Sequence, residues 1–190
     1  MKLAAAEAHW ETAARAPALV GGWADEQREE TRYALEIPAL LSVLAHGDPD
    51  AVVLGLKEVP PEDRPPVALT HLSFDVMVGC GTAMAGLAAL SGLLAWRRRE
   101  LLFDRRFLGL VVAVGPLGFI AIEAGWMVTE LGRQPWIIVG VMRTSEAVTP
   151  LPGLAGPFAL FTAVYLGLSA VVIRLMRRQV LASIDEAPHA

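Results

Sequence analysis

The sequence predicts an all-α membrane protein with three transmembrane helices and an extramembrane N-terminal segment of helices and loops. Hydrophobic residues make up 54% of the 190 residues, and the mean hydropathy of +0.47 is too apolar for an ordinary soluble domain. Charged residues gather in the first third of the chain and in short runs between long apolar stretches. A formal net charge of −4 does not favour nucleic-acid binding, and the single cysteine, Cys80, excludes an internal disulfide.

Residues 1–66 are expected to lie outside the membrane, because they are charged and interrupted by proline and glycine. Good helix formers predict a helix over Met1–Arg15. Apolar residues at helical spacing predict a second helix over Tyr33–Ala45, which Pro38 shortens or kinks. The proline-rich stretch Pro60–Pro66 predicts a loop before the first membrane span.

Three apolar stretches each reach the roughly 20 residues that a helix needs to cross a bilayer. The first runs from about Pro66 to Trp96, and its last 21 residues carry no charge. The second runs from about Phe107 to Leu131 and contains only the acids Glu123 and Glu130. The third, from about Pro152 to Ile173, has no charge. All three are expected to be helices, because backbone groups in lipid must be satisfied internally.

The arginines predict how the spans are oriented. The loop 97–106 holds five arginines, and three more follow the third span, namely Arg174, Arg177 and Arg178. Both groups fall on the same side of a three-span series, and the positive-inside rule assigns that side to the cytoplasm. We therefore expect an outward segment 1–66, a membrane region 67–180 and a cytoplasmic tail 181–190.

The stretch Gly125–Trp136, GWMVTELGRQPW, combines an acid in an apolar helix with a helix stop. Glu130 lies in the last turn, Gly132 is expected to form a left-handed cap, and Pro135 ends the helix. A carboxylate beside lipid needs a partner or a metal, and Arg133 lies within i,i+3 reach. Two interpretations are open: a helix-end ion pair beside an interfacial tryptophan, or a functional site.

A second acid extends this face of the helix. Glu123, Trp126 and Glu130 follow one another at i, i+3 and i+7, which separates the two carboxylates by about 10 Å along the axis. That distance is too long for one metal ion and suits one ligand together with one member of a proton relay. The alternative is that both acids pair with basic residues of neighbouring helices.

Met77 in the first span is a candidate axial ligand of a haem iron. Gly79 and Gly81 leave flat backbone beside it, against which a macrocycle can lie. The alternative is a methionine that fills a gap where two helices approach closely. Asp75 is expected to reach outward or to pair with an arginine of another chain, and His71 is expected to be an interfacial histidine of no special role.

Together these motifs resemble subunit I of the cytochrome bd quinol oxidases. The segments that carry the resemblance are GWMVTE and GRQPW within Gly125–Trp136, HLSFDVMVGCG at His71–Gly81, KLAAAEAHWET at Lys2–Thr12 and PEDRPP at Pro61–Pro66. Gly125–Trp136 looks like the signature of the family, and His71–Gly81 looks like its low-spin haem segment. Lys2–Thr12 looks like the end of the periplasmic loop that handles quinol. The resemblance covers essentially the whole chain.

The resemblance implies roles for the membrane residues. Met77 would be one axial ligand of the low-spin haem b. Glu130 would bind an iron of the high-spin pair, haem b and haem d, at a site that includes Trp126 and Arg133. Glu123 would deliver protons or line the haem pocket.

Two positions outside the spans acquire roles in the same way. Lys2 and Glu7 fall on the lysine and glutamate that the family uses for quinol.

Asp75, inside the first span, stands where some members carry arginine or glutamine, so no electrostatic role is carried over to it.

The implied function is that of part of a bacterial plasma-membrane oxidase, which oxidises quinol and reduces oxygen to water. The implied partners are quinol, oxygen, the lipid bilayer, the N-terminal part of subunit I and subunit II. Because the family's upstream helices carry the histidine ligands, this chain alone is expected to bind haem weakly or not at all. The alternatives are a haem-free or inactive membrane fragment for interaction or assembly, and a quinone-binding anchor that uses other haems.

Overall fold

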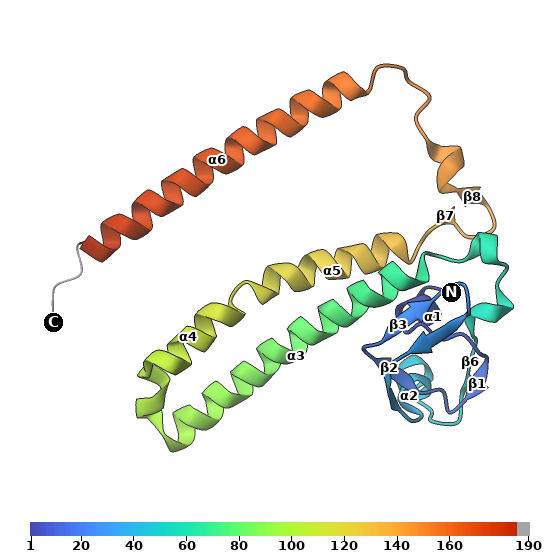
Figure 1. The fold of residues 1–190 in the computed structure, drawn as a ribbon, viewed down its shortest axis with the longest axis horizontal. Helices are drawn as coiled ribbons and strands as arrows, with labels where there is room; N and C mark the ends of the chain where they lie inside the picture. The colour runs from blue at the N-terminus through green and yellow to red at the C-terminus, as the bar shows by residue number, and fades with distance from the viewer. Residues whose placement is uncertain (186–190) are drawn as a thin grey trace. The chain divides into compact units, whose positions relative to one another are not determined.

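The computed structural model describes residues 1–185 and divides the chain into two compact units, Met1–Ala147 and Val148–Ala190 (Figure 1). The described part of the chain is mostly helical. Three helical segments are long and apolar enough to cross a membrane, namely Val67–Arg97, Arg105–Leu131 and Ala155–Leu181. The predicted fold class is therefore confirmed. The last five residues of the predicted tail, which include His189, lie outside the described residues.

The N-terminal segment contains short strands as well as helices. Its elements are α1 (Lys2–Ala6), β1 (Ala13–Ala14), β2 (Ala18–Val20), β3 (Trp23–Asp25), β4 (Glu30–Arg32), β5 (Leu35–Ile37), α2 (Leu40–His46), β6 (Val52–Val53) and the 3-10 turns η1 (Leu56–Glu58) and η2 (Pro61–Asp63). The strands form three antiparallel pairs, β1 with β6, β2 with β5 and β3 with β4.

Both helices predicted in this segment are wrong in extent. The helix expected over Met1–Arg15 ends at Ala6, and the chain then turns through Ala8, which has a positive φ of 45°. Tyr33–Ala45 contains a strand before Pro38 and a helix after it. In both places pairing with a distant strand overrides the local helix propensity.

Two small cores hold the segment together. The first contains Ala4, Ala5, Ala8, Trp10, Ala24, Leu56 and Val67, and the second contains Ala16, Ala18, Leu41 and Val53. Val67 is the first residue of α3, so the first core joins the segment to the membrane region. In the second core the buried Ser42 hydroxyl accepts from the Ala16 N–H at 2.8 Å and donates to the Ala51 carbonyl at 2.8 Å.

The first two spans form an antiparallel pair. They comprise α3 (Val67–Arg97), the 3-10 turn η3 (Arg99–Phe103), α4 (Arg105–Val114) and α5 (Leu117–Leu131). The second predicted span is interrupted between α4 and α5 at Pro116, which has no N–H to donate. Helices α3 and α5 lie side by side (Figure 1).

Gly132 follows the end of α5 and allows close packing there through its small size, not through the predicted left-handed cap. Gly132 has a φ of −67°, so the predicted left-handed cap is wrong. A Cβ on Gly132 would lie 2.7 Å from the Val128 carbonyl oxygen and 3.0 Å from Lys2 Cγ. The position therefore needs glycine for space rather than for backbone freedom. After α5 come a hairpin of β7 (Trp136–Ile138) and β8 (Met142–Arg143), and then η4 (Thr144–Ala147).

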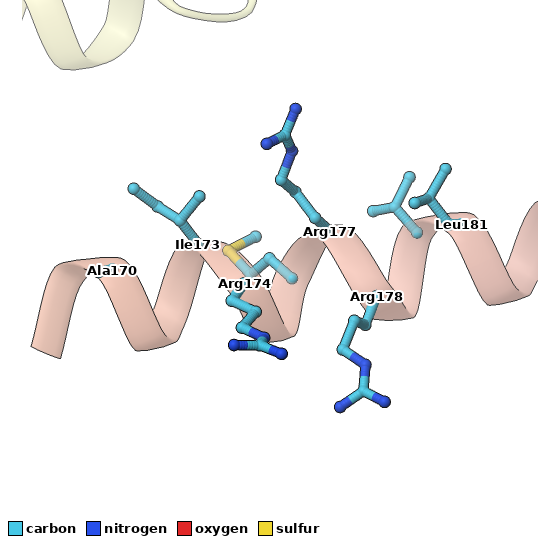
Figure 2. A pocket seen from close by; sticks show the side chains of 8 residues that line it. Ala170, Ile173, Arg174, Arg177, Arg178 and Leu181 are labelled. Carbon is cyan, nitrogen blue, oxygen red and sulfur yellow. The ribbon is translucent and has the colours of Figure 1, made fainter.

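The second unit contains one described element, α6 (Ala155–Asp185), which extends well past the predicted end of the third span at Ile173. Its three arginines all lie in the C-terminal half of the helix. Figure 2 shows Arg174 and Arg178 on one side of α6 and Arg177 on the other. The side of the membrane on which they lie stays a prediction.

We expect Gly55→Ala to destabilise residues 1–66. A Cβ at Gly55 would lie 2.3 Å from the carbonyl oxygen of Trp10. Because this neighbour is backbone, the chain after α1 and the chain before η1 must move apart. The expected cost is about 1–3 kcal/mol, measured as lost amide hydrogen-exchange protection in the segment.

Gly86→Ala is the matched control, because a Cβ on Gly86 meets no atom within 4 Å. The residue lies inside α3, where alanine is more favourable than glycine. Protection of residues 1–66 should then stay at the wild-type level. Equal protection in Gly55→Ala and wild type would contradict the close approach at Gly55.

Candidate functional site

Met77 lies in the contact between α3 and α5. Its side chain is half-buried, and its Sδ is 3.0 Å from the position that a Cβ on Gly125 would occupy. The close approach of the helices thus comes from Gly125, whereas a Cβ on Gly79 or Gly81 would meet nothing within 4 Å. The thioether fills a helix contact, as expected for a methionine that packs two helices together. Open glycine backbone also lies near it on its own helix, as expected for a haem ligand.

Glu123, Trp126 and Glu130 form one exposed face of α5. The buried residues of this helix, Ala124 and Val128, lie on the side that packs against α3. The three predicted site residues therefore share a face, and that face is turned away from the contact containing Met77. At its edge, Glu123 reaches an apolar groove of about 430 Å³ that α3 also lines.

The helix-end ion pair between Glu130 and Arg133, one of the two interpretations left open by the sequence, is absent among the described residues. Glu130 is exposed. The physical reason is that α5 ends at Leu131, so Arg133 no longer occupies a helical i+3 position. The backbone carbonyl of Glu130 instead accepts a long hydrogen bond of 3.5 Å from Gln134 Nε2.

Lys2 and Arg133 line one recess of about 200 Å³ where α1 meets the end of α5. Trp136 and Thr129 complete its sides. Lys2 reaches this place because Gly132 has no side chain to block it. The structure thus brings together two cations that lie far apart in the sequence.

Glu7 lies apart from Lys2, although both belong to the predicted quinol site. Glu7 is buried at the C-terminal end of α1, and its Oε2 accepts from the Leu19 N–H at 3.4 Å. Burial raises the pKa of Glu7, whereas the hydrogen bond from Leu19 and the nearby His71 act in the opposite direction. Lys2 is exposed in the recess at Gly132, so the structure does not bring the two residues to one point.

His71 and Asp75 were assigned no useful role by sequence reasoning, and the structure corrects this. His71 is 1% exposed and buried against residues 1–66. Pairing with an arginine of another chain stays a prediction for Asp75, but within this chain its Oδ2 lies 3.4 Å from His71 Nε2. Its Oδ1 accepts from the Gly21 N–H at 3.3 Å. The i,i+4 spacing of the two residues was the signal that could have found this pair.

The donors fit haem better than a bare metal ion. Among residues 1–185, no group of three or more histidine, cysteine or acidic side chains could hold a metal. A porphyrin supplies four nitrogens, so its iron needs only one or two protein ligands, and a thioether or a carboxylate can be one of them. Met77 lies between α3 and α5, whereas Glu130 lies on the exposed face of α5, which fits two separate haem groups rather than one.

Fold and donors together fit a membrane protein that contributes single ligands to haem groups. Comparison with known proteins gives the family. The model of the cytochrome bd terminal oxidase subunit I family matches residues 1–184. The solved bd oxidase of Geobacillus thermodenitrificans is similar with a TM-score of 0.79 and 45% identity, over 93% of this chain and 41% of that chain.

Curated relatives agree with this match. The cytochrome bd ubiquinol oxidase subunit 1 of Bacillus subtilis (strain 168) is 34% identical over 203 residues, covering 100% of this chain and 43% of the relative. A second subunit I from the same organism is 37% identical over 92% of this chain and 39% of the relative. Subunit 1 of the cytochrome bd-II ubiquinol oxidase of Escherichia coli (strain K12) is 30% identical, over 80% of this chain and 42% of the relative.

The chain belongs to the cytochrome bd terminal oxidase subunit I family. It spans about two fifths of the length of the relatives it matches. Membership establishes haem as the class of cofactor and a bacterial membrane as the setting, which confirms the predicted resemblance.

We expect Glu7→Gln to stabilise residues 1–66 at neutral pH. Burial raises the pKa of Glu7 above its ordinary 4.5, so the folded state binds this proton more tightly than the unfolded state. The linked stability is complete below about pH 4.5 and declines as the pH rises through the folded pKa. Glutamine removes the ionisation and keeps an oxygen for the Leu19 N–H, and hydrogen exchange of β2 measures the gain.

Glu36→Gln on β5 is the control, because Glu36 is an exposed carboxyl in the neighbouring strand. It should leave exchange in β2 unchanged at both acidic and neutral pH. Faster exchange of β2 in Glu7→Gln than in wild type at neutral pH would show that the charged form is the one that the fold favours.

Proposed function

We propose that this chain forms part of a cytochrome bd-type terminal oxidase, which oxidises quinol and reduces oxygen to water. The match to the subunit I family over residues 1–184 carries this proposal. The sulfur of Met77 and the carboxylate of Glu130 support it, since each lies on a membrane-length helix and would serve as a single protein ligand to a haem iron. The quinol oxidase names of the relatives support the reaction type.

Quinol is proposed to react at the outer end of the helix pair, near Lys2 and Glu7. A buried carboxyl with a raised pKa is suited to take up a proton from a quinol hydroxyl and release it to the outside. Lys2 adds positive charge at the recess beside Arg133, which favours the partly ionised quinol oxygen. Binding and proton uptake are thus assigned to separate side chains of α1.

Met77 is proposed to hold the low-spin haem b, and Glu130 an iron of the high-spin pair of haem b and haem d. When bound, haem supplies one-electron transfer and oxygen chemistry, and methionine ligation raises its reduction potential. Trp126 shares the exposed face of α5 with Glu130 and offers an aromatic surface next to the carboxylate. Arg133, which follows the end of α5, would supply a cation to this site from the recess that it shares with Lys2.

Glu123 is proposed to move protons toward the oxygen-reducing site. It lies two turns before Glu130 on the exposed face of α5. The groove that it reaches is otherwise apolar, lined by Leu72, Val76 and Phe119 among others. An acid in such surroundings exchanges protons with a partner rather than with bulk water.

The proposed complex includes the part of subunit I that lies N-terminal to the matched region, on the same or another polypeptide, together with subunit II. Residues 1–66 face outward, and loop 97–106 and the C-terminus face the cytoplasm, because of the arginines in that loop and on α6. The family match over residues 1–184 disfavours the alternatives without an oxidase role, namely a haem-free fragment and a quinone-binding anchor.

We expect Met77→Leu to remove most of the low-spin haem b signal from reduced-minus-oxidised spectra of membranes holding the complex. Leucine keeps the apolar contact with Gly125 but cannot bind iron. Glu130→Gln should instead weaken the high-spin signals. Met84→Leu is the matched control, because Met84 lies on the same helix with its Sδ 3.8 Å from the Cβ position of Gly118.

Membranes that contain this chain without the remaining part of subunit I should show little or no haem. Stoichiometric haem in those membranes, or a normal low-spin signal in Met77→Leu, would overturn the assignment of ligands. Loss of the signal in Met84→Leu as well would mean that helix packing rather than ligation had been disturbed.

We expect Glu123→Ala to slow oxygen consumption by about 100-fold or more, the lower end of the range for a proton-transferring group. Glu123→Asp keeps an ionisable oxygen and should retain more activity than alanine. Oxygen uptake with saturating quinol measures both variants. An unchanged rate in Glu123→Ala would remove this residue from the proton path.

A further inference from the structure

His71 makes a set of buried contacts that the proposed function has not used. Its Nδ1 lies 2.8 Å from the carbonyl oxygen of Ala6, and its Nε2 lies 3.3 Å from that of Gly21. Nε2 also lies 3.4 Å from Asp75 Oδ2. All three oxygens are acceptors, so each of these hydrogen bonds forms only where the ring nitrogen facing it carries a proton. We call His71, Asp75 and their contacts with Ala6 and Gly21 the His71 clasp.

The His71 clasp holds the backbone on both sides of Glu7. Ala6 directly precedes Glu7 in the chain. Gly21 follows β2, whose Leu19 N–H donates to Glu7 Oε2 at 3.4 Å. Asp75 Oδ1 accepts from the Gly21 N–H at 3.3 Å, so the turn after β2 is fixed at both its N–H and its carbonyl. The position of the Glu7 carboxyl therefore depends on α3 through two separate segments.

The same helix carries the His71 clasp and Met77. Six residues separate His71 from Met77, which is about 9 Å along the axis. A helix is stiff over this distance, so the clasp sets where Glu7 stands relative to the thioether. Two alanines of α1 also pack on Val67 of α3 in the first core, so the clasp adds polar contacts to an apolar one.

We propose that His71, oriented by Asp75, is a positioning residue that holds Glu7 in place for quinol oxidation. The inference rests on the proposed function and names a residue pair for its quinol site. His71 does not touch the reacting atoms. It acts by fixing the Ala6 carbonyl and, with Asp75, the turn at Gly21.

Three substitutions of His71 in the complete oxidase separate its contacts. His71→Leu removes both ring nitrogens. It should raise the KM for a short-chain quinol, or lower kcat for that quinol, by about tenfold. This is the effect expected for buried hydrogen bonds to a carbonyl and a carboxylate. His71→Asn places an amide N–H near the Nδ1 position and should restore most activity through Ala6. His71→Gln reaches the Nε2 position only and should restore less.

Two further measurements keep a positioning role apart from general damage. An artificial reductant that does not use the quinol site should be oxidised at the wild-type rate by His71→Leu, and the low-spin haem b spectrum should be unchanged. Asp63→Asn is the matched control, because it breaks another link between the N-terminal segment and the end of the helix pair, the 2.6 Å ion pair with Arg143. It should leave quinol kinetics unchanged.

The outcomes are distinguishable. Wild-type quinol kinetics in His71→Leu, in a complex that is otherwise active, would overturn the inference and leave the proposed function intact. Loss of the haem spectrum, or equal defects in His71→Asn and His71→Leu, would also overturn it, since His71 would then serve the fold alone. A wild-type complex without quinol oxidase activity would refute the proposed function itself.

Discussion

The burial of the start of α3 against residues 1–66 is the contact on which the extramembrane segment depends. Val67 belongs to its first core, and His71 is hydrogen-bonded to backbone carbonyls on two sides. The segment's own elements are very short, with strands of two or three residues and helices of at most seven. Such elements do not persist alone, so their order comes from packing on a helix that the membrane stabilises independently.

The helix pair of α3 and α5 holds the two candidate haem ligands, a thioether and a carboxylate, at separate places. Met77 lies between α3 and α5 at Gly125, whereas Glu130 and Trp126 stand on the outward face of α5. A single site containing both donors is therefore excluded, and two haem sites that share a helix pair agree with this arrangement. At the extramembrane end, Lys2 and Arg133 line one recess, while the His71 clasp holds Glu7 elsewhere. In the proposed function, substrate binding and proton uptake are therefore assigned to different side chains of α1 and its C-terminal end.

Sequence reasoning succeeded for the membrane region and failed for details that depend on distant contacts. The three spans were predicted from length and apolarity alone, and the i, i+3, i+7 face of Glu123, Trp126 and Glu130 follows from helical periodicity. The ion pair of Glu130 with Arg133, one of two interpretations that the sequence left open, does not form because the helix ends between them. The short strands of the N-terminal segment escaped prediction because each one exists only through its partner strand.

By itself, the sequence determined that this chain places three helices in a membrane and carries the motifs of cytochrome bd subunit I. Lipid leaves an apolar stretch of this length no other structure, and the motifs are local. Only the tertiary structure decided which polar groups meet. His71 reaches a carbonyl 65 residues away, and Gly132 makes room for Lys2. Such contacts follow from how helices and loops fill shared space, and no local pattern of residues contains that information.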